Sequence, residues 1–95
     1  TKEYKIYKNI KNNETSISND CIIFINEDLN GNVLVGTGYG LNILDVKKDT
    51  FKRYTEKDGL IDNTIYGILV DKNNGIWMST NAGISKLSTE DAKYI

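Results

Sequence analysis

The chain has 95 residues, with 12 lysines and arginines against 13 aspartates and glutamates, so its formal net charge at pH 7 is −1. This balanced charge, with no basic stripe or acidic tail, argues against nucleic acid or an anionic membrane as a partner. The chain contains no histidine, a single cysteine and no apolar run near the roughly 18 residues of a spanning helix, so it offers no usual general base, no internal disulfide and no membrane insertion.

The first predicted element is a short strand at residues 4–7, where the sequence YKIY is rich in aromatic and β-branched side chains. A polar segment dominated by asparagine, lysine and serine follows, up to Asn19. This composition predicts a long loop.

Residues 21–54 contain four short apolar runs separated by glycine, asparagine and aspartate: CIIFI, VLV, LNILDV and FKRYT. No run keeps the 3.6-residue spacing of a helix, so each is predicted to be a strand. Asn30-Gly31 can supply the positive φ of a hairpin turn, which predicts antiparallel pairing. Cys21 begins the first apolar run and is expected to be buried, as free cysteines commonly are.

The same order of runs and turns returns 43 positions later, with Asn74-Gly75 at the second turn. The tail after Ser88 is predicted to be a turn that leads into a last outer strand, and the alternative is a helix start, because Asp91 follows Ser88 at capping-box spacing. A shift of 43 residues superposes Ile22 on Ile65, Ile25 on Ile68, Asp28 on Asp71, Thr37 on Thr80, Leu44 on Leu87 and Phe51 on Tyr94.

A repeat of about 43 residues with four short strands predicts an all-β protein made of β-propeller blades, about two four-stranded antiparallel blades from a larger propeller. The expected organisation is a single propeller fragment over residues 1–95. In it, residues 4–7 are an outer strand of a preceding blade, 21–54 a complete blade and 64–95 most of a second. The alternative is a small two-sheet sandwich, because sandwiches also use many short strands.

Two segments carry a family resemblance: GNVLVGTGYGLNILD, and GLIDNTIYGILVDKNNGIWMSTNAGISKL. Both resemble the two-component regulator propeller repeat. The first copy departs from the pattern at Leu34, where the second has the preferred Trp77, and the second has Ser79 where the first has the expected Gly36.

The resemblance implies an extracytoplasmic (periplasmic or cell-surface) sensor in a membrane protein of the sensor histidine kinase type, which recognises a carbohydrate or another nutrient. The output module, such as a histidine kinase, would lie elsewhere in the parent protein. The expected partners are other propeller blades or copies of this chain, because two blades alone expose apolar faces, together with an oligosaccharide ligand. The alternative is a structural or dimerisation scaffold without a small-molecule site.

The candidate ligand surface is the face where the loop between the second and third strands of a blade meets the loop that enters the next blade. An aromatic side chain in a glycine-rich loop, and polar groups on loops held by a rigid scaffold, are typical of ligand contacts. Trp77, in mid-strand, is instead expected to pack between blades. The candidate residues are Tyr39, Asn81, Lys57, Asp58, Asp62 and Asn63, beside the loop from Lys8 to Asn19.

No catalytic residue, cofactor or metal site is predicted. Glu27 and Asp28 are adjacent in sequence, and neighbouring strand side chains point to opposite faces, so they do not form a catalytic carboxylate pair. The segments around Asp28 and Asp71 lack the closing glutamate of a hand-like calcium loop. Both aspartates are therefore predicted to stabilise turns, although aspartate and asparagine at the candidate surface can also bond their own backbone.

Overall fold

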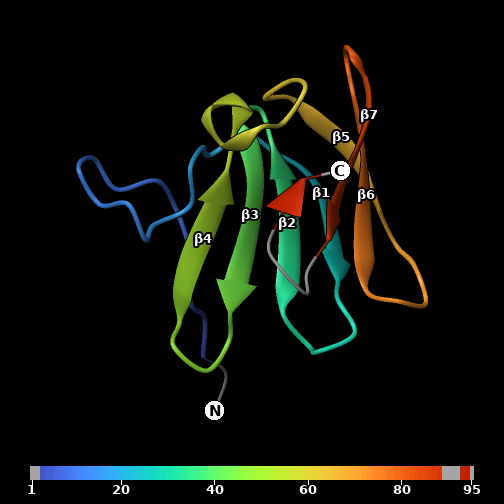
Figure 1. Cartoon of the computed structure of the whole chain (residues 1–95). Coiled ribbons are helices and arrows are strands. Elements are labelled where there is room, and N and C mark those ends of the chain that lie inside the picture. The colour runs from blue at the N-terminus through green and yellow to red at the C-terminus, as the bar shows by residue number, and fades with distance from the viewer. Residues whose placement is uncertain (1–2, 89–92, 95) are drawn as a thin grey trace.

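Strands account for most of the regular structure in this computed structural model, which describes residues 3–88 and 93–94 (Figure 1). The first sheet contains β1 (Ile22–Glu27), β2 (Val33–Thr37), β3 (Gly40–Asp45) and β4 (Thr50–Tyr54). A single 3₁₀ turn, η1 (Glu56–Asp58), lies in the connector that follows. The second sheet contains β5 (Ile65–Val70), β6 (Gly75–Thr80), β7 (Gly83–Ser88) and β8 (Lys93–Tyr94).

Each sheet is a simple antiparallel meander, with strand orders β1-β2-β3-β4 and β5-β6-β7-β8. The chain leaves the first sheet from β4 and enters the second at β5, which lies against β1 and β2. A sandwich would connect its sheets by Greek-key crossings instead. The all-β fold of two successive blades is therefore confirmed, and β8 supplies the predicted last outer strand.

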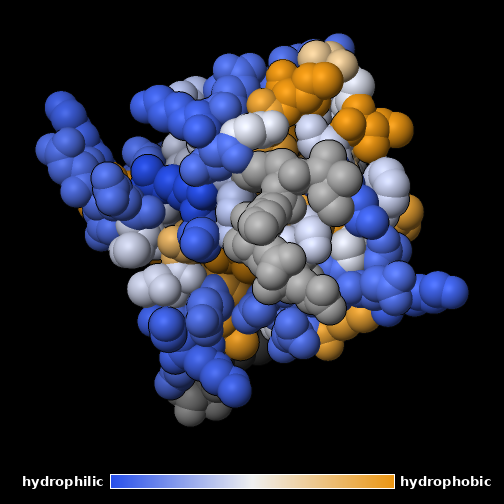
Figure 2. Space-filling view, viewed as in Figure 1, coloured by the Kyte–Doolittle hydropathy of each residue, from blue (hydrophilic) through white to orange (hydrophobic). Residues whose placement is uncertain are grey.

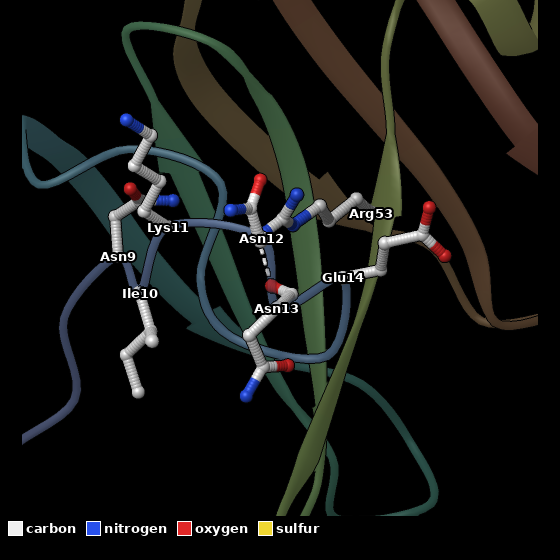
Figure 3. Close-up of a pocket in the computed structure, with 7 residues that line it drawn as sticks. All are labelled: Asn9, Ile10, Lys11, Asn12, Asn13, Glu14 and Arg53. Carbon is white, nitrogen blue, oxygen red and sulfur yellow. Dashed lines mark hydrogen bonds between the residues drawn. The ribbon is translucent and has the colours of Figure 1, made fainter.

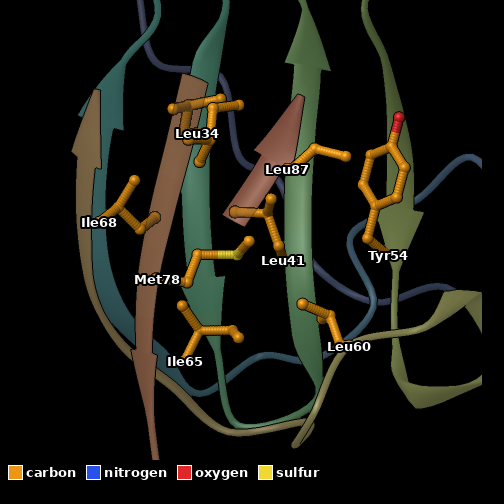
Figure 4. Packing of buried hydrophobic residues seen from close by; sticks show 9 residues of the cluster. Leu34, Leu41, Tyr54, Leu60, Ile65, Ile68, Met78 and Leu87 are labelled. Atoms are coloured by element: carbon orange, nitrogen blue, oxygen red, sulfur yellow. The ribbon is translucent and has the colours of Figure 1, made fainter. Parts of the chain in front are cut away.

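The main core lies between the two sheets (Figure 4). Leu34 and Leu41 of the first sheet are fully buried against Ile65 and Met78 of the second. Leu60, from the connector between the sheets, joins the same cluster. Burying side chains of this kind contributes about 1.5–3 kcal/mol each, so this interface is the principal source of stability.

The 43-residue repeat is visible in the hydrogen bonds of the turns. The carboxylate oxygen Oδ1 of Asp28 accepts bonds from the backbone N–H of Asn30 and Asn32, both at 2.9 Å. Asp71 Oδ1 accepts the equivalent bonds from Asn73 at 2.9 Å and Gly75 at 2.8 Å. The prediction that both aspartates stabilise turns is confirmed.

Only one residue in each turn has positive φ. It is Gly31 at 84° in the first turn and Asn74 at 62° in the second. Gly75 instead begins β6, and an added Cβ there would lie 2.7 Å from Asp71 Oδ2. Each predicted pair therefore supplies positive φ through one member, and Asn74 stands 43 positions after its equivalent Gly31.

Residues 4–7 form no strand, contrary to the prediction. A strand needs a hydrogen-bonding neighbour, and the blade that would supply one does not lie within residues 3–88 or 93–94. Tyr7 instead packs edge-on against Phe51 of β4, with ring centroids 5.4 Å apart. Further along, Ile17 is buried in a second cluster with Val35, Leu44 and Phe51 on the face of the first sheet that turns away from the second.

The opposite, outer face of the second sheet has no sheet over it among the described residues. Leu69, Trp77 and Ile84 lie on this face and are 65%, 38% and 70% exposed. Figure 2 also shows hydrophobic surface at the upper right, around the upper ends of β5 and β7 in Figure 1. The expectation that two blades expose apolar faces is confirmed, but Trp77 does not pack between the two sheets of this chain.

Cys21 is exposed, so the prediction that it is buried is wrong. It lies just before β1, an edge strand whose residues Ile22, Phe24 and Ile25 are also exposed. Its carbonyl accepts a hydrogen bond from Gly38 N–H at 3.1 Å. The apolar run was correctly read as a strand, but a strand at the edge of a sheet is not necessarily covered.

Candidate functional site

A cavity of about 600 Å³ lies at the end of the first sheet where the β2–β3 turn meets the connector containing η1. It brings together three of the predicted residues, Tyr39, Lys57 and Asp58, with Ser18 from the loop Lys8–Asn19. The other lining residues are Glu14, Thr15, Phe51, Lys52, Arg53 and Thr55. Three separate chain segments therefore meet at one hollow, which is the arrangement expected of a loop-built site.

Tyr39 is held by its backbone, and the residue is 45% exposed. The hydroxyl of Thr37 accepts a bond from Tyr39 N–H at 3.0 Å and donates to the carbonyl of Gly40 at 2.9 Å. Ser18 donates its hydroxyl to the Tyr39 carbonyl at 2.7 Å. The ring therefore projects from a fixed turn, so a ligand stacking on it would not have to order the backbone.

Asp58 is occupied in stabilising η1. Its carboxylate accepts the Thr55 N–H at 2.9 Å, while the Thr55 hydroxyl accepts Lys57 N–H at 3.3 Å, so the two residues form a capping box. Gly59, with φ of 108°, ends the turn in the left-handed conformation. Lys57 is exposed beside the cavity, so its ammonium group can donate a hydrogen bond to a ligand, whereas the Asp58 carboxylate is already bonded to the backbone.

Asp62 and Asn63 have structural roles next to the cavity rather than in its wall. The carbonyl of Asn63 accepts a bond from Gly40 N–H, and its side-chain oxygen accepts Glu56 N–H at 2.7 Å. Asp62 accepts the N–H of Thr64 at 2.8 Å. Both side chains bond the backbone, and Asn63 joins the β2–β3 turn to η1.

Asn81 lies in the β6–β7 turn, exposed at the same end of the molecule as η1 (Figure 1). It does not line the cavity with Tyr39. The turn itself is built like that of the first sheet, since Thr80 accepts Ala82 N–H at 3.1 Å and donates to the Gly83 carbonyl at 2.8 Å. The predicted surface is therefore one face, but its residues do not form one site.

A second hollow, of about 720 Å³, is formed by the polar loop itself and was not anticipated from the sequence (Figure 3). Arg53 reaches into it from β4 and donates to the Asn13 carbonyl at 2.7 Å. Its Nε also donates to the Ser16 carbonyl at 2.9 Å. The guanidinium is thus used to hold the loop, and Lys11 is the other cationic residue that lines the hollow.

No group of three metal-ligating side chains converges anywhere in residues 3–88 and 93–94. Asp71, in the turn between β5 and β6, faces β6, where its Oδ2 accepts the indole N–H of Trp77 at 2.9 Å. This bond, together with the backbone N–H of Gly75, lowers the pKa of Asp71. Lys86 lies 4.9 Å from the Trp77 ring centroid and 3.8 Å from Asp71, so the three side chains form a linked group on the second sheet.

Residues 59–82 match the family described as two component regulator propeller. The matched stretch runs from the end of η1 through β5 and β6 into the β6–β7 turn. No curated protein matches the chain. Within the described residues no helix has the length and apolar character needed to cross a membrane. The all-β blades and this match over residues 59–82 support the resemblance of the repeat to the two component regulator propeller.

Proposed function

We propose that this two component regulator propeller domain is a non-catalytic sensor that binds a carbohydrate or another nutrient outside the cytoplasm. The cavity formed by Tyr39, Lys57 and Ser18 is its ligand site. In this proposal the domain is the extracytoplasmic part of a membrane protein, and a separate output module of the parent protein, such as a histidine kinase, receives the signal.

The observation that carries the ligand proposal is the exposed Tyr39 side chain at the edge of a cavity whose other lining residues, apart from Phe51, are polar or charged. Sugar rings have apolar faces and polar edges. An aromatic ring can stack on such a face, while hydroxyl and ammonium groups bond the edge. Tyr39 and Lys57 supply these two kinds of contact from two different segments, and Ser18 holds the backbone of Tyr39 in place. The backbone of the β2–β3 turn is already fixed, so a ligand that binds there pays little conformational entropy for ordering it.

The competing function is a scaffold whose blades carry packing surfaces but no ligand. The open apolar face of the second sheet favours it, because contiguous exposed apolar surface commonly marks a protein interface. The two functions differ in what Tyr39 does. A scaffold does not require this ring, whereas the sensor does.

The test is calorimetric titration of the chain with maltotetraose, cellotetraose and xylotetraose. We expect one of these to bind, and Tyr39→Ala to weaken its binding by about three- to tenfold, the worth of an aromatic stacking contact. The midpoint of thermal unfolding should stay unchanged, because Tyr39 is only half-buried. Tyr66→Ala is the matched control, because Tyr66 is similarly exposed at 47% but lies on β5 away from the cavity.

Binding by Tyr39→Ala with the affinity of the wild type would overturn the assignment of the site. If none of the three oligosaccharides binds, the carbohydrate class is wrong, and the scaffold function becomes the better account.

A further inference from the structure

The segment that enters the first sheet is longer than the connector that enters the second. Ile17 and Leu60 stand 43 positions apart and are the equivalent buried residues near the ends of these two segments. The runs YKIY at residues 4–7 and FKRY at residues 51–54 are also equivalent in the repeat. The first run ends ten residues before Ile17, whereas the second ends six residues before Leu60. The first segment therefore contains four additional residues.

The additional length is folded into a closed loop at residues 10–16, which we call the inserted loop. The N–H of Ile10 donates to the Ser16 hydroxyl at 2.9 Å, and this hydroxyl donates to the Asn13 carbonyl at 2.8 Å. A tight turn, closed by a bond from Asn13 N–H to the Ile10 carbonyl at 3.1 Å, places Asn12 at its tip with a φ of 64°. Asparagine adopts this left-handed conformation more readily than most residues.

Arg53 fixes the inserted loop to the first sheet. Its Nε and Nη2 donate to carbonyl groups of the loop, among them those of Ser16 and Asn13. Figure 3 shows this side chain reaching from β4 to Asn13. A guanidinium has five N–H donors, and Nε and Nη2 account for three of them. Nη1 has no hydrogen-bond partner among the described residues, so it can still donate to a ligand.

The hollow of the inserted loop adjoins the cavity at Tyr39. Glu14 and Arg53 line both, so the two spaces share a wall. Their volumes are about 720 and 600 Å³. Each lies within the range of about 300–1,000 Å³ that is usual for small-molecule pockets. The two hollows together therefore offer a continuous surface for a ligand longer than either one could hold.

Three polar side chains of the inserted loop are not used by the fold. Lys11, Asn12 and Glu14 are exposed, and none of them makes a side-chain hydrogen bond or ion pair within the described part of the chain. An ammonium group donates, a carboxylate accepts and an amide does both. Sugar hydroxyl groups also donate and accept. Unused polar groups on a loop that is already fixed are suited to bind such a chain at little cost in ordering.

We propose that the inserted loop is a second subsite of the ligand site, and that the ligand is a linear oligosaccharide extending from Tyr39 across Arg53 to Lys11 and Asn12. The inference rests on the proposed function, because it takes the Tyr39 cavity as the first subsite. One sugar unit stacks on Tyr39, and units further along the ligand bond the inserted loop. The second subsite makes the affinity depend on the length of the oligosaccharide.

The test is calorimetric titration of the full chain with maltose, cellobiose and xylobiose, and with the tetrasaccharides of the same three series. In the series that binds, we expect the tetrasaccharide to bind about tenfold more tightly than the disaccharide, the worth of one or two hydrogen bonds in the second subsite. The double variant Lys11→Ala/Asn12→Gly should remove this gain and leave disaccharide binding unchanged. Its thermal midpoint should match the wild type, because both side chains are exposed and glycine accepts the positive φ of Asn12.

The matched control is Lys72→Ala/Asn73→Gly. These two residues have the same side chains and are likewise exposed. They lie in the β5–β6 turn, at the end of the second sheet that points away from η1 (Figure 1). The control removes the same charge and the same amide without touching either hollow, so it should bind the tetrasaccharide as the wild type does.

Equal affinity of the wild type for disaccharide and tetrasaccharide would overturn the second subsite. So would a Lys11→Ala/Asn12→Gly variant that keeps the wild-type affinity for the tetrasaccharide. In both cases the cavity at Tyr39 remains the ligand site if Tyr39→Ala weakens binding, so the two failures are distinguishable. Absence of binding by all of the oligosaccharides would overturn this inference together with the proposed carbohydrate ligand.

Discussion

Ile65 of the second sheet packs directly on Gly36 of the first, so closely that a Cβ at position 36 would lie 2.8 Å from Cγ2 of Ile65 and 3.1 Å from its carbonyl oxygen. The backbone of Gly36 is extended, so the glycine is required for space and not for its φ. This contact sets the distance between β2 of the first sheet and β5 of the second.

Gly36→Ala should therefore destabilise the protein by about 1–3 kcal/mol, the usual cost of overpacking a core. Chemical denaturation monitored by circular dichroism measures the change in the free energy of unfolding. Gly67→Ala is the control, because its new methyl would meet only the hydroxyl of Ser79 on the outer face of the second sheet. An equal loss in both variants would show that the sheets do not pack as described.

Asp28 is the polar centre of the first turn and is itself buried. Asp28→Ala leaves the N–H groups of Asn30 and Asn32 without their acceptor, and we expect a loss of about 1–3 kcal/mol in unfolding free energy. Glu14→Ala, an exposed acidic residue, controls for the change in net charge. A variant as stable as the wild type would mean that water replaces the carboxylate at no cost.

The bond between Trp77 and Asp71 makes the fluorescence of the single tryptophan sensitive to pH. The pKa of Asp71 is lowered in the folded protein, mainly because Trp77 donates to it, so the charged carboxylate stabilises the fold. This stabilisation is fully present above the ordinary value of 3.8 and is lost as pH falls through the lowered value. Trp77 fluorescence should change below pH 3.8 in the wild type.

Asp71→Asn should abolish that fluorescence change. Circular dichroism recorded over the same pH range separates a local event from acid unfolding. The same fluorescence midpoint in wild type and variant would assign the transition to another carboxylate.

Leu60 and Ile61 are neighbours in the connector with opposite environments, 4% and 50% exposed. Leu60→Ala should reduce the free energy of unfolding by about 2–5 kcal/mol, because Leu60 belongs to the cluster between the sheets. Ile61→Ala should cost much less. Similar losses would indicate that the connector does not insert into the interface.

The strands and their pairing could be predicted because their causes are local. Short runs of strand-forming residues, turn residues and a 43-residue repeat can all be recognised in the sequence. The turns at Asp28 and Asp71 could be predicted because aspartate carboxylates accept hydrogen bonds from nearby backbone N–H groups. Even there, the sequence named the pair Asn74-Gly75 for the positive φ of the second turn, and the structure shows that only Asn74 adopts it, because Gly75 begins β6.

The remaining features depend on what lies next to each strand, which a single sequence does not state. Cys21 and Trp77 sit in strand-like runs, but Cys21 lies at a sheet edge and Trp77 lies on a face that no other sheet covers within the described part of the chain. The candidate site divides in the same way. Tyr39 and Lys57 reach one cavity, whereas Asp62 and Asn63 bond the backbone beside it and Asn81 lies on another turn.

The measurement that tests the packing of the two repeats most directly is the set of nuclear Overhauser contacts from the side-chain methyl groups of Ile65 and Ile68. The account predicts contacts from Ile65 to the α-protons of Gly36 and from Ile68 to Leu34, with none from Ile84 to the first sheet. Contacts from Ile84 to Leu34 or Leu41, in place of those from Ile65, would show that the second sheet presents its other face and would contradict the repeat packing described above.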